Sequence, residues 1–167
     1  GLGDVYKRQV LDRNSGEEVF EGPSESMSKS KKNVIDPETV IKLYGADSVR
    51  WFMLSDSPPE RDIQWSDEGI SGSYKFMQKI WNISETINNL DPKTKMDDET
   101  KNILDKSINK LIKDVTLAIE SFHFNVAVAK FYEFINILSK VLHDKNEDKI
   151  YLQKLFAEFL TLISPFI

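Results

Sequence analysis

Apolar residues recur at helical spacing through the last hundred residues of the chain. Three successive stripes have the i, i+3, i+4 pattern of amphipathic helices. The first consists of Leu104, Ile108, Leu111, Val115, Ile119 and Phe122, the second of Ala127, Phe131, Phe134, Ile135, Leu138 and Leu142, and the third of Leu152, Leu155, Phe156, Phe159 and Leu162. Together with a helix that precedes them, these stripes predict an α-helical bundle over residues 66–167.

Local signals mark helices before these stripes. Asp36 is a good N-cap and Pro37 suits the first helical position, and Gly45 is a suitable end for this helix. The apolar run 47–54 predicts a second short helix, although a buried strand has the same pattern. Ser66 then caps a helix to about Asn89, whose predicted apolar stripe consists of Ile70, Tyr74, Met77, Trp81 and Ile87.

The first part of the chain has a different pattern. Two extended segments, 10–13 and 17–20, flank a turn with Gly16 and predict a β-hairpin. The polar stretch 21–33 follows and predicts a loop. Residues 1–9 resemble a translated sequencing adapter, so we assign them no fold. The expected domains are therefore 10–60 and 61–167, with a boundary at the Pro58-Pro59 turn.

Composition excludes several classes of protein. The 167 residues contain no cysteine and only two histidines, His123 and His143, which argues against disulfides, a thiolate nucleophile and a metal site. No run of about 18 apolar residues occurs, and we predict no membrane association. No leader is evident and the apolar stretch 159–167 stops without a cap, so we expect an internal fragment of a cytoplasmic protein. The net charge of −5 means that a polyanion must bind a local cluster of cations.

Such a cluster lies in the polar loop. Its core reads Ser26-Met27-Ser28-Lys29-Ser30-Lys31-Lys32-Asn33, with three lysines in four residues. Ammonium groups bind polyphosphate oxygens, and small serines allow the backbone to approach and donate hydrogen bonds. A solvated Ser/Lys linker has the same composition, so composition alone leaves both interpretations open.

The order of the residues favours the first interpretation. Met27-Ser28-Lys29-Ser30 resembles four of the five residues of the Lys-Met-Ser-Lys-Ser signature of class I aminoacyl-tRNA synthetases. Asn33, Asp36-Pro37, Tyr44-Gly45-Ala46-Asp47 and Arg50 resemble the family's continuation, and Lys31-Lys32-Asn33 and the segment 58–69 are most similar to leucyl-tRNA synthetases. The resemblance extends from about Gly22 to Trp81. Ser26 departs from it, because the signature has its first lysine there.

The resemblance implies a mainly α fold: a hairpin and loop (24–33) from the end of a Rossmann-type catalytic domain, followed by a truncated anticodon-binding bundle. It implies an ATP-dependent leucine–tRNA ligase that forms leucyl-adenylate, with Mg²⁺ expected on the ATP, and transfers leucine to tRNA(Leu). Lys29 is the predicted catalytic residue. Met27, Ser28, Lys29 and Ser30 are the predicted ATP-binding residues, whereas Lys31 and Lys32 either add charge or are only solvated. The leucine pocket lies outside this segment, so the isolated chain is expected to be inactive.

Other interpretations remain open at this point. The chain is alternatively part of a valine or isoleucine enzyme of the same class, or a noncatalytic helical interaction module. Trp51, Trp65 and Trp81 are interpreted as packing residues, and neither histidine is assigned to a site. Lys75 and Lys79 lie four residues apart on one helix, and we expect a solvated face there, with tRNA phosphates as the alternative.

Overall fold

The computed structural model describes residues 10–11, 15–16, 18–19, 25–144 and 147–167. Its contacts divide the chain into two compact units, residues 1–35 and 36–167. In the first unit, β1 (Val10–Leu11) pairs antiparallel with β2 (Glu18–Val19), with Val10 opposite Val19. The segment assigned to a sequencing adapter (1–9), and residues 12–14, 17 and 20 of the expected hairpin, lie outside the described residues. That this pair ends a Rossmann-type domain stays a prediction.

The second unit begins where the capping signals predict. The Asp36 carboxylate accepts hydrogen bonds from the backbone N–H groups of Glu38 (3.3 Å) and Thr39 (3.2 Å), and α1 spans Pro37–Tyr44. Gly45 ends α1 with a φ of +79°, a conformation that favours glycine, and its N–H donates to the carbonyl of Ile41 (2.9 Å). The run that also resembled a strand is a helix, α2 (Ala46–Ser55).

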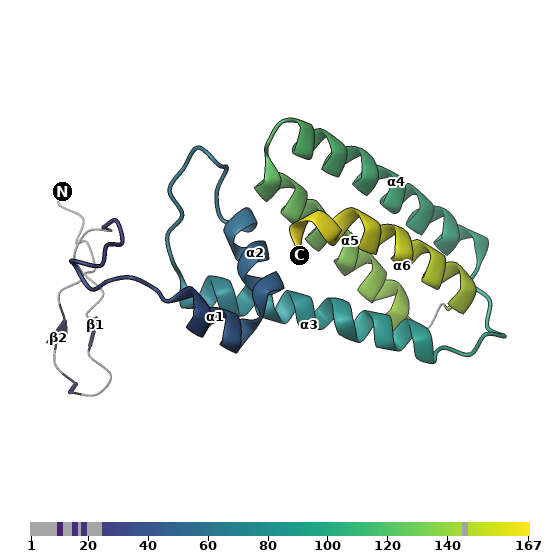
Figure 1. Cartoon of the computed structure of the whole chain (residues 1–167). Coiled ribbons are helices and arrows are strands. Elements are labelled where there is room, and N and C mark those ends of the chain that lie inside the picture. The colour runs from purple at the N-terminus through teal and green to yellow at the C-terminus, as the bar shows by residue number, and fades with distance from the viewer. Residues whose placement is uncertain (1–9, 12–14, 17, 20–24, 145–146) are drawn as a thin grey trace, which may run out of the picture. The chain divides into compact units, whose positions relative to one another are not determined.

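Four longer helices form the predicted bundle. They are α3 (Asp67–Asn89), α4 (Asp98–Glu120), α5 (Phe124–His143) and α6 (Lys149–Ile163), and a 3₁₀ turn, η1 (Ser164–Phe166), follows (Figure 1). Ser66, Asp97 and Asp148 cap α3, α4 and α6 by accepting backbone N–H bonds, which satisfies donors that would otherwise lack partners. The prediction of a mainly helical chain is confirmed. No described helix is long and apolar enough to cross a bilayer.

The core of the bundle extends to α2. Trp51 on α2 is completely buried, stacks on Phe76 of α3 (ring centroids 4.8 Å apart) and donates from Nε1 to the Tyr132 hydroxyl of α5 (3.1 Å). Arg50 also donates to the carbonyl of Pro165 in η1 (3.0 Å). Because these contacts join α2 to the bundle, the compact unit starts at Asp36, and the boundary expected near residue 60 lies inside it.

The rotation of α3 differs from the predicted stripe. Its buried residues are Ile70, Ser73, Phe76, Ile80, Ile83 and Ile87. Trp81 is 66% exposed and Tyr74 is 36% exposed, so the interpretation of Trp81 as a packing residue is wrong, whereas Trp51 is buried as expected. The isoleucines at 80 and 83, together with Phe76, form a larger apolar face than the aromatic stripe does, and this face turns towards the core.

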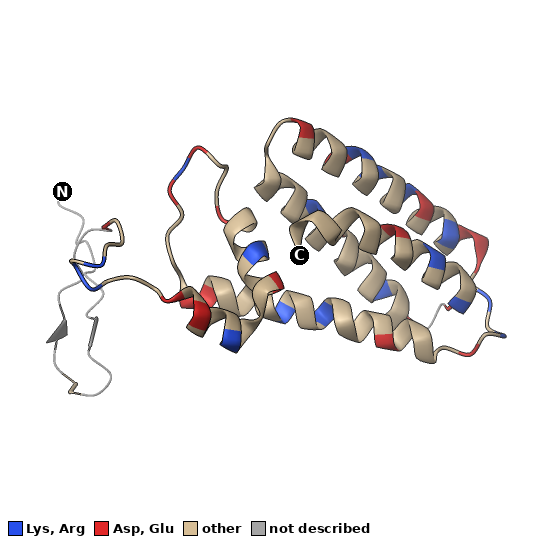
Figure 2. Ribbon diagram, viewed as in Figure 1, with Lys and Arg blue, Asp and Glu red and all other residues tan. Residues whose placement is uncertain are grey.

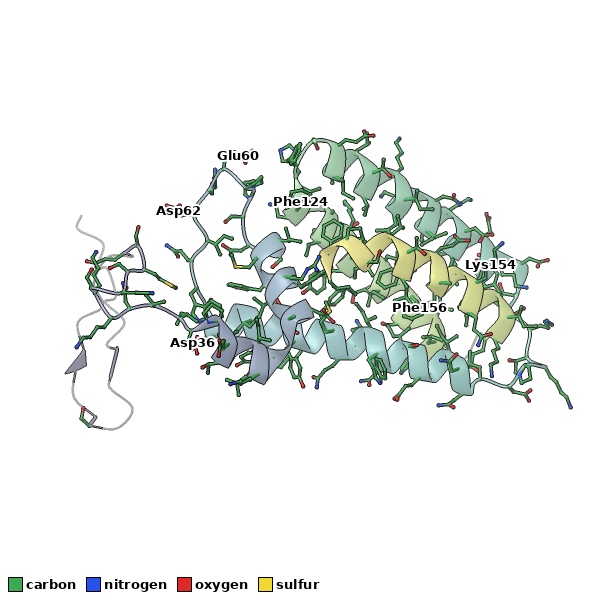
Figure 3. All side chains as sticks on the ribbon, viewed as in Figure 1. Asp36, Glu60, Asp62, Phe124, Lys154 and Phe156 are labelled. Atoms are coloured by element: carbon green, nitrogen blue, oxygen red, sulfur yellow. The ribbon has the colours of Figure 1, made fainter. Side chains whose placement is uncertain are left out.

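Most members of the other stripes are buried, and the exceptions lie near the end of α4. Ile119 is 38% exposed and Phe122 is 63% exposed. Phe122 follows the helix with a φ of +58°, so the helical period no longer applies at that position. On α6, Phe156 lies among the packed side chains and Lys154 on the outer surface (Figure 3).

Candidate functional site

The lysine-rich loop folds into two overlapping turns. The N–H of Lys31 donates to the Ser28 carbonyl (3.2 Å) and the N–H of Lys32 donates to the Lys29 carbonyl (3.2 Å). The hydroxyls of Ser28 and Ser30 share a hydrogen bond (3.1 Å), and Ser28 Oγ also accepts from the Lys31 N–H (3.3 Å). The two serines therefore make hydrogen bonds within the turns, as small hydroxyl residues commonly do in loops.

Asn33 closes this loop with its side chain. Its Oδ1 accepts a hydrogen bond from the N–H of Ser28 (2.8 Å), and its Nδ2 donates to the carbonyl of Ser26 (3.4 Å). One side-chain amide thus holds two backbone groups at the start of the loop. Residues 26–33 form a ring closed by hydrogen bonds rather than an extended linker.

The three lysines of the loop differ in their partners. Lys31 Nζ lies 2.8 Å from Glu25 Oε2, and both side chains are about half exposed. Lys29 and Lys32 are also exposed, and neither has an ion pair with another described residue. Lys32 has a φ of +54°. The Glu25 carboxylate therefore offsets one cation and leaves two available to an anion.

The loop brings together the residues that the signature predicts. Met27, Ser28, Lys29 and Ser30 are consecutive, and Met27 is 47% exposed. Sequence reasoning did not find the roles of Asn33 and Glu25. An asparagine directly after a serine-rich turn is a signal for a side-chain clamp, whereas the pairing of Glu25 with Lys31 across six residues has no comparable signal. In the described part of the chain, no three His, Asp or Glu side chains gather as metal ligands would.

A second basic feature lies between α3 and α5. A groove of about 530 Å³ is lined by Lys75 and Lys79 from α3 and by His143 from α5, among other residues. Lys79 Nζ donates to Asn136 Oδ1 on α5 (3.0 Å). In Figure 2 the two lysines colour the middle of α3 blue. The helix face that was expected to be only solvated is therefore part of a groove.

Two protein families match separate parts of the chain. Residues 19–66 match the family described as tRNA synthetases class I (I, L, M and V), and residues 101–167 match the anticodon-binding domain of tRNA ligase. The curated relatives distinguish among the amino acids. A leucine–tRNA ligase of Bartonella quintana is 41% identical over 95% of this chain, one of Mesorhizobium japonicum is 42% identical over 86%, and one of Ruegeria pomeroyi is 46% identical over 75%.

The chain belongs to the leucyl-tRNA synthetase family. It spans 19%, 17% and 14% of the lengths of these three relatives, so it corresponds to a small part of a leucyl-tRNA synthetase. A solved structure supports the same family. The crystal structure of the Agrobacterium radiobacter K84 agnB2 LeuRS–tRNA–LeuAMS ternary complex matches 84% of this chain and 18% of that chain, with a TM-score of 0.70 and 25% identity.

Proposed function

We propose that this chain supplies the ATP-phosphate loop and part of the tRNA-binding bundle of an enzyme that makes leucyl-tRNA. In this proposal ATP and leucine give leucyl-adenylate and pyrophosphate, and the leucyl group then passes to tRNA(Leu). Residues 10–60 end the Rossmann-type catalytic domain and residues 61–167 belong to the bundle. Mg²⁺ arrives bound to ATP, and the enzyme acts in the cytoplasm, where its tRNA is used.

The observation that carries this proposal is the arrangement of charge in the closed loop. Asn33 holds the backbone of the loop, and Glu25 offsets the charge of Lys31. Lys29 is exposed within the signature segment and pairs with no other described residue, so its ammonium is available to a phosphate oxygen. A cation held at this point favours the negative charge that develops on the departing pyrophosphate.

Leucine-dependent ATP/pyrophosphate exchange by the intact synthetase tests the role of Lys29. Loss of one preorganised contact of this kind costs about 3 kcal/mol, so we expect Lys29→Ala to lower exchange roughly a hundredfold. Lys31→Ala is the matched control, because it removes the same charge from a lysine that already has a carboxylate partner. Ser26→Ala should have a small effect. Equal small losses in all three variants would refute the assignment of Lys29.

A separate variant tests the closed loop. Asn33→Ala removes the hydrogen bonds to Ser28 and Ser26 but changes no charge. We expect it to weaken ATP binding and lower exchange by about tenfold, because each hydrogen bond contributes on the order of 1 kcal/mol to the ordered conformation. Asn33→Asp can still accept from Ser28 and should retain more activity. An Asn33→Ala enzyme with the parent's KM for ATP would show that the ring is not needed.

The choice of amino acid and the fragment character have their own tests. Pyrophosphate exchange that depends on leucine, and not on valine or isoleucine, separates this proposal from other enzymes of the class. The 167-residue chain alone should not leucylate tRNA, because we propose that the leucine pocket lies elsewhere in the enzyme. Measurable turnover by the isolated chain would contradict that placement.

A further inference from the structure

The groove between α3 and α5 combines positive charge with an absence of carboxylates. Lys75, Lys79 and His143 line it, and no aspartate or glutamate does so among the described residues. The whole chain has a net charge of −5, so this local excess of cations runs against the overall balance. A groove of this kind attracts an anionic ligand even on an acidic protein.

Lys79 differs from the other lysines that have side-chain partners. Lys130 pairs with Glu133 (2.8 Å) and Lys101 with Asp148 (3.1 Å), so carboxylates offset both charges. Lys79 instead donates to the neutral amide oxygen of Asn136 (3.0 Å). This bond holds the ammonium between the two helices and leaves its full charge available. Asn136 therefore acts as a positioning residue.

The remaining polar groups determine what the groove can bind. The hydroxyls of Thr86 and Ser139 donate to carbonyls of their own helices (2.8 and 2.6 Å). The available donors are the ammonium groups of Lys75 and Lys79 and the side-chain amide of Asn82, which suit a ligand made of acceptor oxygens. His143 lies beside Asp144, with Nδ1 and Oδ1 3.5 Å apart, so we assign it no charge.

The two lysines also have the right spacing for a chain of phosphates. They are four residues apart on α3 and therefore lie on one side of the helix, one turn from each other. A single anion such as a carboxylate needs only one of them, whereas a phosphodiester backbone presents a row of charges. Lysine is suited to this contact because its ammonium binds phosphate without a fixed geometry.

We propose that this groove binds the phosphodiester backbone of RNA, with Lys75 and Lys79 on phosphates and Asn136 positioning Lys79. The inference rests on the proposed function, in which the RNA is tRNA(Leu). It assigns a part of the surface that lies between the two regions matched by the family models, since α3 ends before residue 101 and begins after residue 66.

Binding of a tRNA(Leu) transcript to the 167-residue chain, measured by filter retention across a salt series, tests the groove. We expect the double variant Lys75→Gln and Lys79→Gln to bind roughly five- to tenfold more weakly at low salt. The slope of log K against log [salt] should fall by about one for each lysine that contacts a phosphate. The matched control is Lys106→Gln with Lys113→Gln, which removes two exposed lysines from α4 and changes the net charge equally. The control should bind within twofold of the parent.

A variant that keeps both lysines makes the test sharper. Asn136→Asp places a carboxylate 3.0 Å from Lys79 Nζ and offsets its charge, so we expect it to weaken binding as much as Lys79→Gln. Circular dichroism establishes that each variant keeps its helices. Binding of tRNA that is equal in all variants would overturn the groove and leave the proposed function intact. An unaltered chain that binds no tRNA at low salt would overturn both the groove and the tRNA-binding role of the bundle.

Discussion

Replacement of Trp51 by alanine should detach α2 from the bundle at a large cost in stability. The side chain is completely buried between Phe76, Phe131, Tyr132 and Phe166. A buried tryptophan removes about 150–250 Å² from water, which at about 25 cal/mol per Å² corresponds to about 4–6 kcal/mol as an upper bound. Large-to-small replacements of aromatic core residues cost about 3–5 kcal/mol. We therefore expect Trp51→Ala to lower the free energy of unfolding by about 4 kcal/mol.

Trp51→Phe separates packing from hydrogen bonding. Phenylalanine can keep the stack on Phe76, but it loses the bond from Nε1 to the Tyr132 hydroxyl and leaves a small cavity. The expected cost is about 1–3 kcal/mol. In a double-mutant cycle, Trp51→Phe with Tyr132→Phe should then show a coupling of at least about 0.5 kcal/mol.

Urea unfolding followed by far-UV circular dichroism measures these free energies by linear extrapolation. Trp81→Ala is the matched control, since it deletes the same side chain from a position that is 66% exposed. We expect the control to change stability by about 0.5 kcal/mol or less. Equal losses for Trp51→Ala and Trp81→Ala would refute the burial argument and the placement of α2 in the core.

Two further changes have expected outcomes that differ in sign or in pH dependence. Gly69→Ala should destabilise by about 1–3 kcal/mol, because its Cβ would lie 2.6 Å from Phe52 Cε2, whereas Gly72→Ala meets no atom within 4 Å and should stabilise α3 by about 0.5–1 kcal/mol; thermal unfolding compares them. Burial raises the pKa of Asp148, but the hydrogen bond from Lys101 and further partners outweigh it and hold this pKa below its usual value. The contribution of Asp148 is therefore present above about pH 4 and lost as the pH falls through its lowered pKa, so the stability gap between Asp148→Asn and the parent should narrow between about pH 5 and pH 3. A gap that is constant with pH would contradict this.

Helix ends were predictable because their causes are local. Asp36 with Pro37, Gly45 and Ser66 each act within a few residues, and the structure places α1 and α3 accordingly. The rotation of α3 was less predictable. Apolar residues occur on two sides of this helix, and only the partners on α2 and α5 determine that Phe76 rather than Trp81 is buried.

The candidate loop shows the same division. The order Met27-Ser28-Lys29-Ser30 was enough to suggest a family, because a signature is a local string of residues. The ring closed by Asn33 depends on the path of the backbone, which composition does not contain. The groove at Lys79 was also beyond sequence reasoning, since it requires the distance from α3 to Asn136 on α5.

The Glu25–Lys31 pair makes the charge of the loop adjustable. Both groups are about half exposed, and exposed ion pairs of this kind contribute less than about 1 kcal/mol. An incoming polyanion can therefore draw Lys31 away from Glu25 with little loss of stability. The loop presents two ammonium groups while the pair is closed and three once it opens, so its attraction for an anion increases as the anion arrives.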